Sequence, residues 1–246
     1  MALLPWHKGI IQKIVQETPS TRRFWIQIPE LERFDFVPGQ FVSLDLPIHE
    51  KPHKRVRSYS IASAPDGSNT VELVIVWMEG GAGTTYLFSE AEVGTEMPIR
   101  GPLGVFTLPQ NLDRDIYFIC TGTGIAPFRS MLHHIDQHNV PHQNIYLLFG
   151  TRTKTDLLYY EEMMRLAQNI PQFHYLPTLS REQWEGCCGY VHTLYEQLVL
   201  EKKNTLGELP PASFYLCGWK NMVDEAKQRI LALGYDKKAI HLELYG

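Results

Sequence analysis

Short apolar segments separated by turn-forming residues occupy the chain from Trp6 to about Leu108. The segments are rich in β-branched and aromatic residues, and proline or glycine follows most of them. Many short strands at this spacing favour a closed antiparallel barrel. The pattern predicts strands at residues 9–16, 22–28, 40–46, 55–61, 71–77 and 96–100.

After a polar link at residues 109–115 the pattern changes. Apolar runs of the buried-strand type occur at 116–120, 145–149, 173–179, 214–217 and 240–244. Helical stretches separate them at 127–137, 159–168, 191–200 and 222–233. Strands that alternate with helices predict a doubly wound parallel sheet, which binds ligands at the carboxyl ends of its strands. The sequence therefore predicts two domains, at residues 1–110 and 111–246.

The composition is that of a soluble globular protein. Of the 246 residues, 44% are hydrophobic and 20% are charged, which suffices for a full core. The net charge of -4 argues against nucleic acid as the main partner. No apolar run approaches the length of a membrane span, and the first residues lack the blocks of a signal peptide. We therefore expect a cytoplasmic protein with no nucleic-acid partner and no membrane span.

The cysteines and histidines do not predict a metal site. The spacings of Cys120, Cys187, Cys188 and Cys217 match no iron–sulfur or structural zinc pattern, and the ten histidines are scattered. The adjacent Cys187 and Cys188 make a poor disulfide because neighbouring positions cannot easily reach unstrained geometry. Any redox chemistry therefore requires a dissociable cofactor.

The motif Arg57-Ser58-Tyr59-Ser60 combines groups that suit a flat, phosphate-bearing ligand. In an extended strand Arg57 and Tyr59 share one face, and Ser58 and Ser60 share the other. Arginine binds phosphate bidentately, and tyrosine can stack on a ring system. The motif alone also fits an ordinary strand with one surface arginine.

A glycine-rich stretch at residues 80–89 interrupts the strands. Its glycines leave the backbone bare, and Thr84 is expected to be the N-cap of a short helix. Free amides at a helix N-terminus bind phosphate. Taken alone, the stretch fits a flexible hairpin loop equally well. Beside Arg57, it would supply the second side of a pyrophosphate clamp.

In the second half, the predicted strands end in residues suited to nucleotide binding. The first strand runs into a glycine turn at residues 121–127, and the next two end near Arg152 and Arg181. A lone Gly-x-Gly is weak evidence for nucleotide binding, and a loop arginine is usually a solvated charge. Two arginines at the same edge of one sheet are harder to dismiss. The fourth strand ends at Cys217, which also fits a small buried apolar residue.

Together these motifs resemble the ferredoxin–NADP reductase family. The Arg57-x-Tyr59-Ser60 motif, the Gly81-x-x-Thr84 motif and the string Gly-Pro-Leu-Gly-Val-Phe at 101–106 resemble its flavin domain. The string Gly-Thr-Gly-Ile-Ala-Pro-Phe-Arg-Ser at 122–130 is similar to its nucleotide-binding turn. The resemblance covers nearly the whole chain, with the motifs in family order.

The resemblance implies an FAD-binding β-barrel domain and an NADP(H)-binding α/β domain, with the chemistry in the cleft between them. It places Arg57 on the pyrophosphate, Tyr59 against the isoalloxazine ring and Ser60 near flavin N5. The residues implied in catalysis are Ser60, Cys217 and Glu243. The residues expected to bind the cofactors are Arg57, Ser58, Tyr59, Ser60, Val74, Val76, Gly83, Thr84, Thr85, Gly122, Thr123, Gly124, Arg152, Ser180, Arg181, Tyr190, Cys217, Gly218, Met222 and Tyr245.

The resemblance also favours NADP(H) over NAD(H). Arg152 and Arg181 match positions that hold the 2′-phosphate in the family, and Tyr190 matches an aromatic that packs on the adenine. Against this, Cys187-Cys188 lies in a loop where some relatives add another basic residue. Thr84 replaces the commoner serine, and Gly246 follows the tyrosine with which members often end.

We therefore predict an FAD-dependent enzyme that transfers hydride between NADP(H) and flavin. It would exchange single electrons with a separate ferredoxin or flavodoxin, since no iron–sulfur domain is fused to it. An alternative enzyme is the reductase component of a multicomponent oxygenase. A non-enzyme alternative is an electron-transfer subunit or redox sensor within a larger complex. The dihydroorotate dehydrogenase accessory subunit resembles this layout, but its C-terminal cysteine cluster is not matched here.

Overall fold

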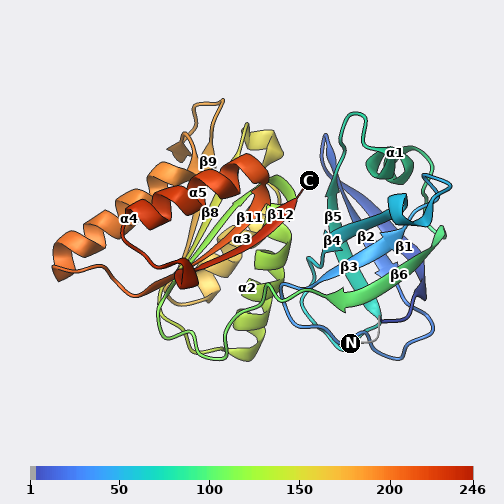
Figure 1. Ribbon diagram of the computed structural model, residues 1–246, viewed down its shortest axis with the longest axis horizontal. Coiled ribbons are helices and arrows are strands. Elements are labelled where there is room, and N and C mark those ends of the chain that lie inside the picture. The colour runs from blue at the N-terminus through green and yellow to red at the C-terminus, as the bar shows by residue number, and fades with distance from the viewer. Residues whose placement is uncertain (1–3, 246) are drawn as a thin grey trace. The chain divides into compact units, whose positions relative to one another are not determined.

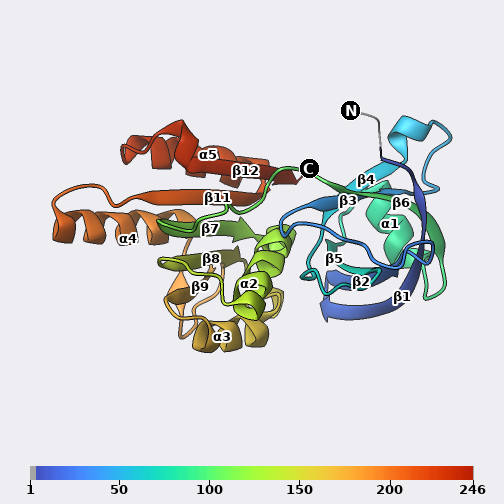
Figure 2. The same cartoon turned by 90° about the horizontal axis from the view of Figure 1, so that it is seen from below.

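The protein, represented by a computed structural model that describes residues 4–245, folds into two compact units (Figures 1 and 2). The barrel unit runs to Thr107 and also includes Ala126–His134. The parallel-sheet unit comprises Leu108–Ile125 and the chain from Ile135 onward. Gly246 lies outside the described residues. The domain boundary at residue 110 remains a sequence-based prediction.

The barrel unit contains a six-stranded antiparallel sheet in the order β4-β3-β6-β1-β2-β5. An isolated bridge between Ile61 and Leu73 joins the two ends of this sheet. This arrangement confirms the predicted antiparallel barrel. The strands are β1 (His7–Thr18), β2 (Thr21–Gln27), β3 (Phe41–Asp45), β4 (Val56–Ser60), β5 (Thr70–Val76) and β6 (Glu96–Leu103).

The core of the barrel follows from the period-2 alternation of its strands. On β5, Val71, Leu73 and Ile75 are buried in the core cluster, and the intervening residues face the other way. One helix, α1 (Ala82–Ser89), adds Leu87 to the same cluster. A short 3-10 turn, η1, precedes β4 at Pro52–Lys54.

The second unit is built on a six-stranded parallel sheet in the order β10-β9-β8-β7-β11-β12. Helices connect most of its strands, as the alternating pattern predicts, and a loop connects β9 to β10. The strands are β7 (Asp115–Thr121), β8 (Ile145–Thr151), β9 (Phe173–Leu179), β10 (Cys187–Cys188), β11 (Ala212–Trp219) and β12 (Ile240–Tyr245). The helices are α2 (Ala126–His138), α3 (Tyr160–Asn169), α4 (Val191–Leu206) and α5 (Lys220–Ala232), with 3-10 turns η2 (Gly122–Ile125), η3 (Lys154–Asp156) and η4 (Lys237–Ala239).

Both faces of the parallel sheet are covered. Consecutive residues of β7 from Asp115 to Cys120 are all buried, as expected for a strand with helices on both sides. Residues of α4 and α5 pack against one face in a single core cluster (Figure 1). The parallel register places the carboxyl ends of β7, β8, β9 and β11 along one edge.

Between Leu4 and Tyr245, the structure contains no helix with the length and apolar character needed to cross a membrane. In the same part of the chain, no three histidine, cysteine, aspartate or glutamate side chains gather in a way that could hold a metal ion.

A buried ion network stabilises the barrel unit. Glu72 is only 4% exposed, and its carboxylate accepts from Arg23 Nε at 2.6 Å and from Arg129 Nη1 at 3.1 Å. Arg129 Nη1 also donates to the Ala62 carbonyl at 2.7 Å. Arg129 lies on α2, so this network holds the first part of that helix within the barrel unit.

We expect the substitution Glu72→Gln to lower the free energy of unfolding by about 3 kcal/mol, because it removes the charge of the buried carboxylate that pairs with both Arg23 and Arg129. Urea unfolding followed by fluorescence measures this change. The control is Glu96→Gln, which breaks the exposed pair with Lys8 and should cost less than about 1 kcal/mol. Equal effects of the two substitutions would show that the buried network does not stabilise the unit.

Candidate functional site

Strand β4 brings Arg57 against the start of helix α1. A Cβ atom placed on Gly83 would lie 3.0 Å from Arg57 Cγ, so the stem of the arginine packs where a side chain would otherwise stand. Arg57 Nη1 donates to the carbonyls of Lys54 at 3.0 Å and Val56 at 2.8 Å. The guanidinium is thus held close to the first turn of α1.

The first turn of α1 begins earlier than the sequence predicts. Gly81 is the N-cap, so the prediction that Thr84 caps the helix is wrong. Thr84 lies inside the first turn instead, where its hydroxyl donates to the Gly81 carbonyl at 3.0 Å. As in any α-helix, the first amides of α1 lack an intrahelical acceptor, and the N-cap Gly81 has no side chain that could accept from them. Beside Arg57, these amides form a site suited to an anion.

Tyr59 shares the Arg57 face of β4, as the alternation predicts. Tyr59 packs against the barrel core, and burial raises the pKa of its phenol to about 12 although Arg57 acts to lower it. The phenol therefore remains neutral at physiological pH. Ser60 is buried at the end of the strand.

The remaining predicted residues of the barrel unit lie on β4, β5 and α1. Ser58 is exposed, and its Oγ lies 3.1 Å from Ser43 Oγ. Val74 and Val76 alternate with the core positions of β5 and so share the face that carries Glu72. Thr85 is exposed on α1, and its amide donates to the Gly81 carbonyl.

In the parallel-sheet unit, the turns after β7 and β11 meet through two glycines. A Cβ atom on Gly124 would lie 2.3 Å from the Cys217 carbonyl oxygen. Gly218 has φ +147°, and a Cβ there would lie 2.6 Å from Thr121 Oγ1 and 3.0 Å from Met222 Cε. The structure therefore brings the η2 turn, which contains Gly122 and Thr123, together with the Cys217-Gly218 turn.

Cys217 is fully buried between these turns and β12. It stands opposite Glu243 in the parallel register, two positions before Trp219 stands opposite Tyr245. Burial raises the pKa of the Cys217 thiol well above its usual value, and Glu243 adds to this, whereas a hydrogen bond with Tyr245 acts in the other direction. Cys217 is therefore a neutral thiol in contact with the chain's last described side chain.

Arg152 and Arg181 lie side by side at the carboxyl edge of the sheet. The Arg181 amide donates to the Arg152 carbonyl at 3.0 Å, and the Ser180 amide donates to the Thr151 carbonyl at 3.0 Å. Tyr190 follows Gly189, whose amide donates to the Leu179 carbonyl at 2.8 Å. Its side chain is 72% exposed, which leaves the ring available to a ligand.

Two residues of this edge escaped the sequence analysis. Thr121 Oγ1 is buried and has no hydrogen-bond partner within the described residues. Its position just before the glycine turn could have identified it as a candidate ligand-binding residue. Lys154 lies two residues beyond Arg152, but a loop lysine carries no distinctive pattern. Lys154 becomes notable only through its ion pair with Glu185, which the sequence does not show.

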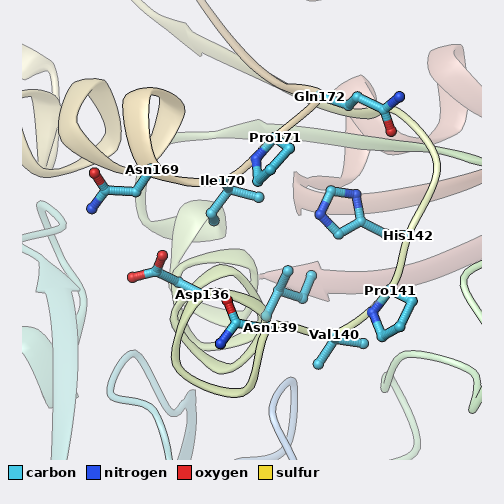
Figure 3. Close-up of a pocket in the computed structure, with 10 residues that line it drawn as sticks. Asp136, Asn139, Val140, Pro141, His142, Asn169, Ile170, Pro171 and Gln172 are labelled. Carbon is cyan, nitrogen blue, oxygen red and sulfur yellow. The ribbon is translucent and has the colours of Figure 1, made fainter.

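The pocket in Figure 3 lies at the other edge of the sheet. It has a volume of about 250 Å³ and is lined by residues that precede β8 and β9, among them Asp136, His142 and Asn169. These are the amino ends of the strands, whereas doubly wound sheets bind ligands at the carboxyl ends. None of the predicted site residues lines it.

Comparisons with known proteins agree with this geometry. The oxidoreductase FAD-binding domain matches residues 8–108, and the oxidoreductase NAD-binding domain matches residues 118–228. Ferredoxin–NADP reductase B of Sorangium cellulosum is 35% identical over 231 residues, which cover 93% of both chains. The chain belongs to the ferredoxin–NADP reductase family. It is an oxidoreductase that uses FAD and a nicotinamide dinucleotide for electron transfer.

Other family members differ in length. The anthranilate 1,2-dioxygenase electron transfer component of Acinetobacter baylyi is 33% identical, but the match covers 80% of this chain and 54% of that protein. The crystal structure of a ferredoxin NADP+ reductase from Neisseria gonorrhoeae with bound FAD and NADP has a TM-score of 0.78 and 25% identity. That match covers 97% of this chain and 98% of the other.

The residues present fit both cofactors. For FAD, the barrel unit offers a guanidinium beside uncapped helix amides, with Gly83 buried where the two meet. For the nicotinamide dinucleotide, the parallel-sheet unit offers a turn with two glycines at Gly122–Gly124 and the buried hydroxyl of Thr121, which has no hydrogen-bond partner among residues 4–245. A polar ligand group in that turn would satisfy the hydroxyl.

We expect the substitution Arg57→Ala to weaken FAD retention by about 1.5–3 kcal/mol, the usual range for a hydrogen bond to a charged group. Dialysis followed by fluorimetry of the released flavin measures the change in Kd. The control is Arg33→Ala, which removes an exposed arginine paired with Asp35 in the same unit. Unchanged retention in Arg57→Ala would exclude Arg57 from the pyrophosphate site.

Proposed function

We propose that the protein is a ferredoxin or flavodoxin–NADP reductase. It transfers hydride between NADP(H) and FAD and exchanges single electrons with a separate carrier protein. The full-length match to the Sorangium reductase supports a protein of this kind, since 93% of each chain is covered. FAD supplies the conversion between hydride and single electrons.

The observation that carries the choice of NADP(H) is the pairing of Arg152 with Arg181. Their backbones are hydrogen-bonded at 3.0 Å, and both side chains are exposed at the carboxyl edge of the sheet. Two exposed arginines on adjoining backbone segments suit a 2′-phosphate, which accepts charge-assisted hydrogen bonds from arginine. In this proposal Ser180 joins them, and the exposed ring of Tyr190 packs on the adenine.

Other residues are proposed to orient the reacting groups. Ser60 donates a hydrogen bond to flavin N5, and Tyr59 packs against the ring as a neutral phenol. Cys217 sets the depth of the nicotinamide, and its neutral thiol places no negative charge beside that ring. Glu243 relays a proton. Tyr245 covers the flavin until the nicotinamide displaces it.

The second candidate is the reductase component of an oxygenase. The identity of 33% with the anthranilate 1,2-dioxygenase electron transfer component favours it. The chain spans 54% of that protein and 65% of the phenol hydroxylase P5 protein of Acinetobacter pittii, so either protein's full activity would need parts that are not matched here.

The test is capture of the electron carrier by the FAD-loaded protein, followed by NADPH-driven reduction of the captured carrier. The proposal expects a small ferredoxin or flavodoxin that NADPH reduces only when the protein is present. Recovery and reduction of an oxygenase instead would support the second candidate. Reduction of an artificial acceptor without any carrier would still separate an enzyme from a redox sensor.

We expect Arg181→Ala to lower kcat/KM for NADPH by about tenfold and to leave that for NADH nearly unchanged. Loss of one well-formed contact worth ~1.4 kcal/mol corresponds to a tenfold decrease in kcat/KM. Steady-state assays measure kcat/KM for NADPH and for NADH. Added salt should reduce the preference for NADPH, because it screens the exposed arginines. The control is Arg165→Ala, an exposed arginine on α3. Equal efficiencies with both nucleotides in the wild type would mean that these arginines do not read the phosphate.

A further inference from the structure

An ion pair ties together the two segments that carry Arg152 and Arg181. Lys154 Nζ lies 2.7 Å from Glu185 Oε1, and the Lys154 amide donates to Glu182 Oε2 at 2.7 Å. Both side chains of the Lys154–Glu185 pair are exposed, at 49% and 68%. Lys154 lies two residues beyond Arg152, and Glu185 lies four beyond Arg181.

The loop that bears Glu185 is internally ordered. The Trp184 indole donates to the Cys187 carbonyl at 2.7 Å, and its ring packs over the position of Gly186. The Lys154 ammonium lies 5.9 Å from the centroid of the Trp184 ring. These contacts order the backbone of the loop without the Lys154–Glu185 ion pair. The ion pair can therefore break without loss of the loop conformation.

We propose that Glu185 is an internal competitor for the 2′-phosphate and that Lys154 is a third cationic ligand of that phosphate. This inference rests on the proposed NADP(H) function and deepens it. A lysine ammonium is a mobile point charge on a flexible stem, and it can turn from a carboxylate to a phosphate within reach. Glu185 thereby sets how strongly the protein prefers NADP(H) over NAD(H).

The direction of the effect separates this role from a structural one. Removal of a competitor strengthens binding of a 2′-phosphate, whereas removal of a structural contact weakens binding of any adenine nucleotide. Glu182 differs from Glu185 because its carboxylate accepts a hydrogen bond from the Lys154 backbone amide and so helps to hold the segment.

The experiment measures Kd by calorimetry for adenosine 2′,5′-bisphosphate and for 5′-AMP, which differ only in the 2′-phosphate. The FAD-loaded full chain is used as wild type, Glu185→Gln, Lys154→Met and the double variant. Glu185→Gln should tighten bisphosphate binding about twofold to fivefold and leave 5′-AMP unchanged. Lys154→Met should weaken bisphosphate binding about fivefold, and in that background Glu185→Gln should have no effect.

The control is Glu208→Gln, which removes the same charge beyond the far end of α4 (Figure 1). A helix of 16 residues is about 24 Å long, well beyond the Debye length of ~8 Å at physiological salt. This variant should bind both ligands as the wild type does.

Several results would overturn the inference. The first is unchanged or weaker bisphosphate binding in Glu185→Gln. The second is an equal gain in bisphosphate affinity from Glu185→Gln in the wild type and in the Lys154→Met background. The proposed function is tested separately by the wild type. If neither the wild type nor Glu185→Gln favours the bisphosphate over 5′-AMP, the NADP(H) assignment fails as well.

Discussion

The parallel-sheet unit depends on one close approach between two backbones. A Cβ atom at Gly124 would lie 2.3 Å from the Cys217 carbonyl oxygen, so any side chain there would push the turn after β7 away from β11. Since β12 pairs with β11, the same approach fixes Glu243 and Tyr245 relative to that turn. Strand pairing holds Cys217, Glu243 and Tyr245 in register, and the absence of a side chain at Gly124 allows the turn after β7 to lie against them.

The barrel unit uses a glycine in a similar way. Gly83 lets the stem of Arg57 pack onto the first turn of α1, which places a fixed positive charge beside uncapped amides. A helix N-terminus carries a partial positive charge of its own, so the two add at one point. Neither group alone would identify a pyrophosphate site. Their combination explains why a dinucleotide, rather than an uncharged ring system, suits this unit.

The architecture could be predicted from the sequence because the strand and helix patterns of apolar residues are local properties of the chain. The sequence was insufficient where a contact joins distant segments. The hydroxyl of Thr84 predicts an N-cap, but Gly81 is the N-cap in the structure and Thr84 lies inside the first turn. The pair of Lys154 with Glu185 depends on how two loops meet at the sheet edge, and no local pattern contains that information.

The central claim is that the two units serve one redox reaction between FAD and a nicotinamide dinucleotide. The most direct measurement is an anaerobic titration of the FAD-loaded protein with NADPH, followed by the visible absorbance of the flavin. We expect stoichiometric NADPH to bleach the flavin and an oxidised one-electron acceptor then to restore the colour. A flavin that stays fully oxidised with excess NADPH and with excess NADH would contradict it.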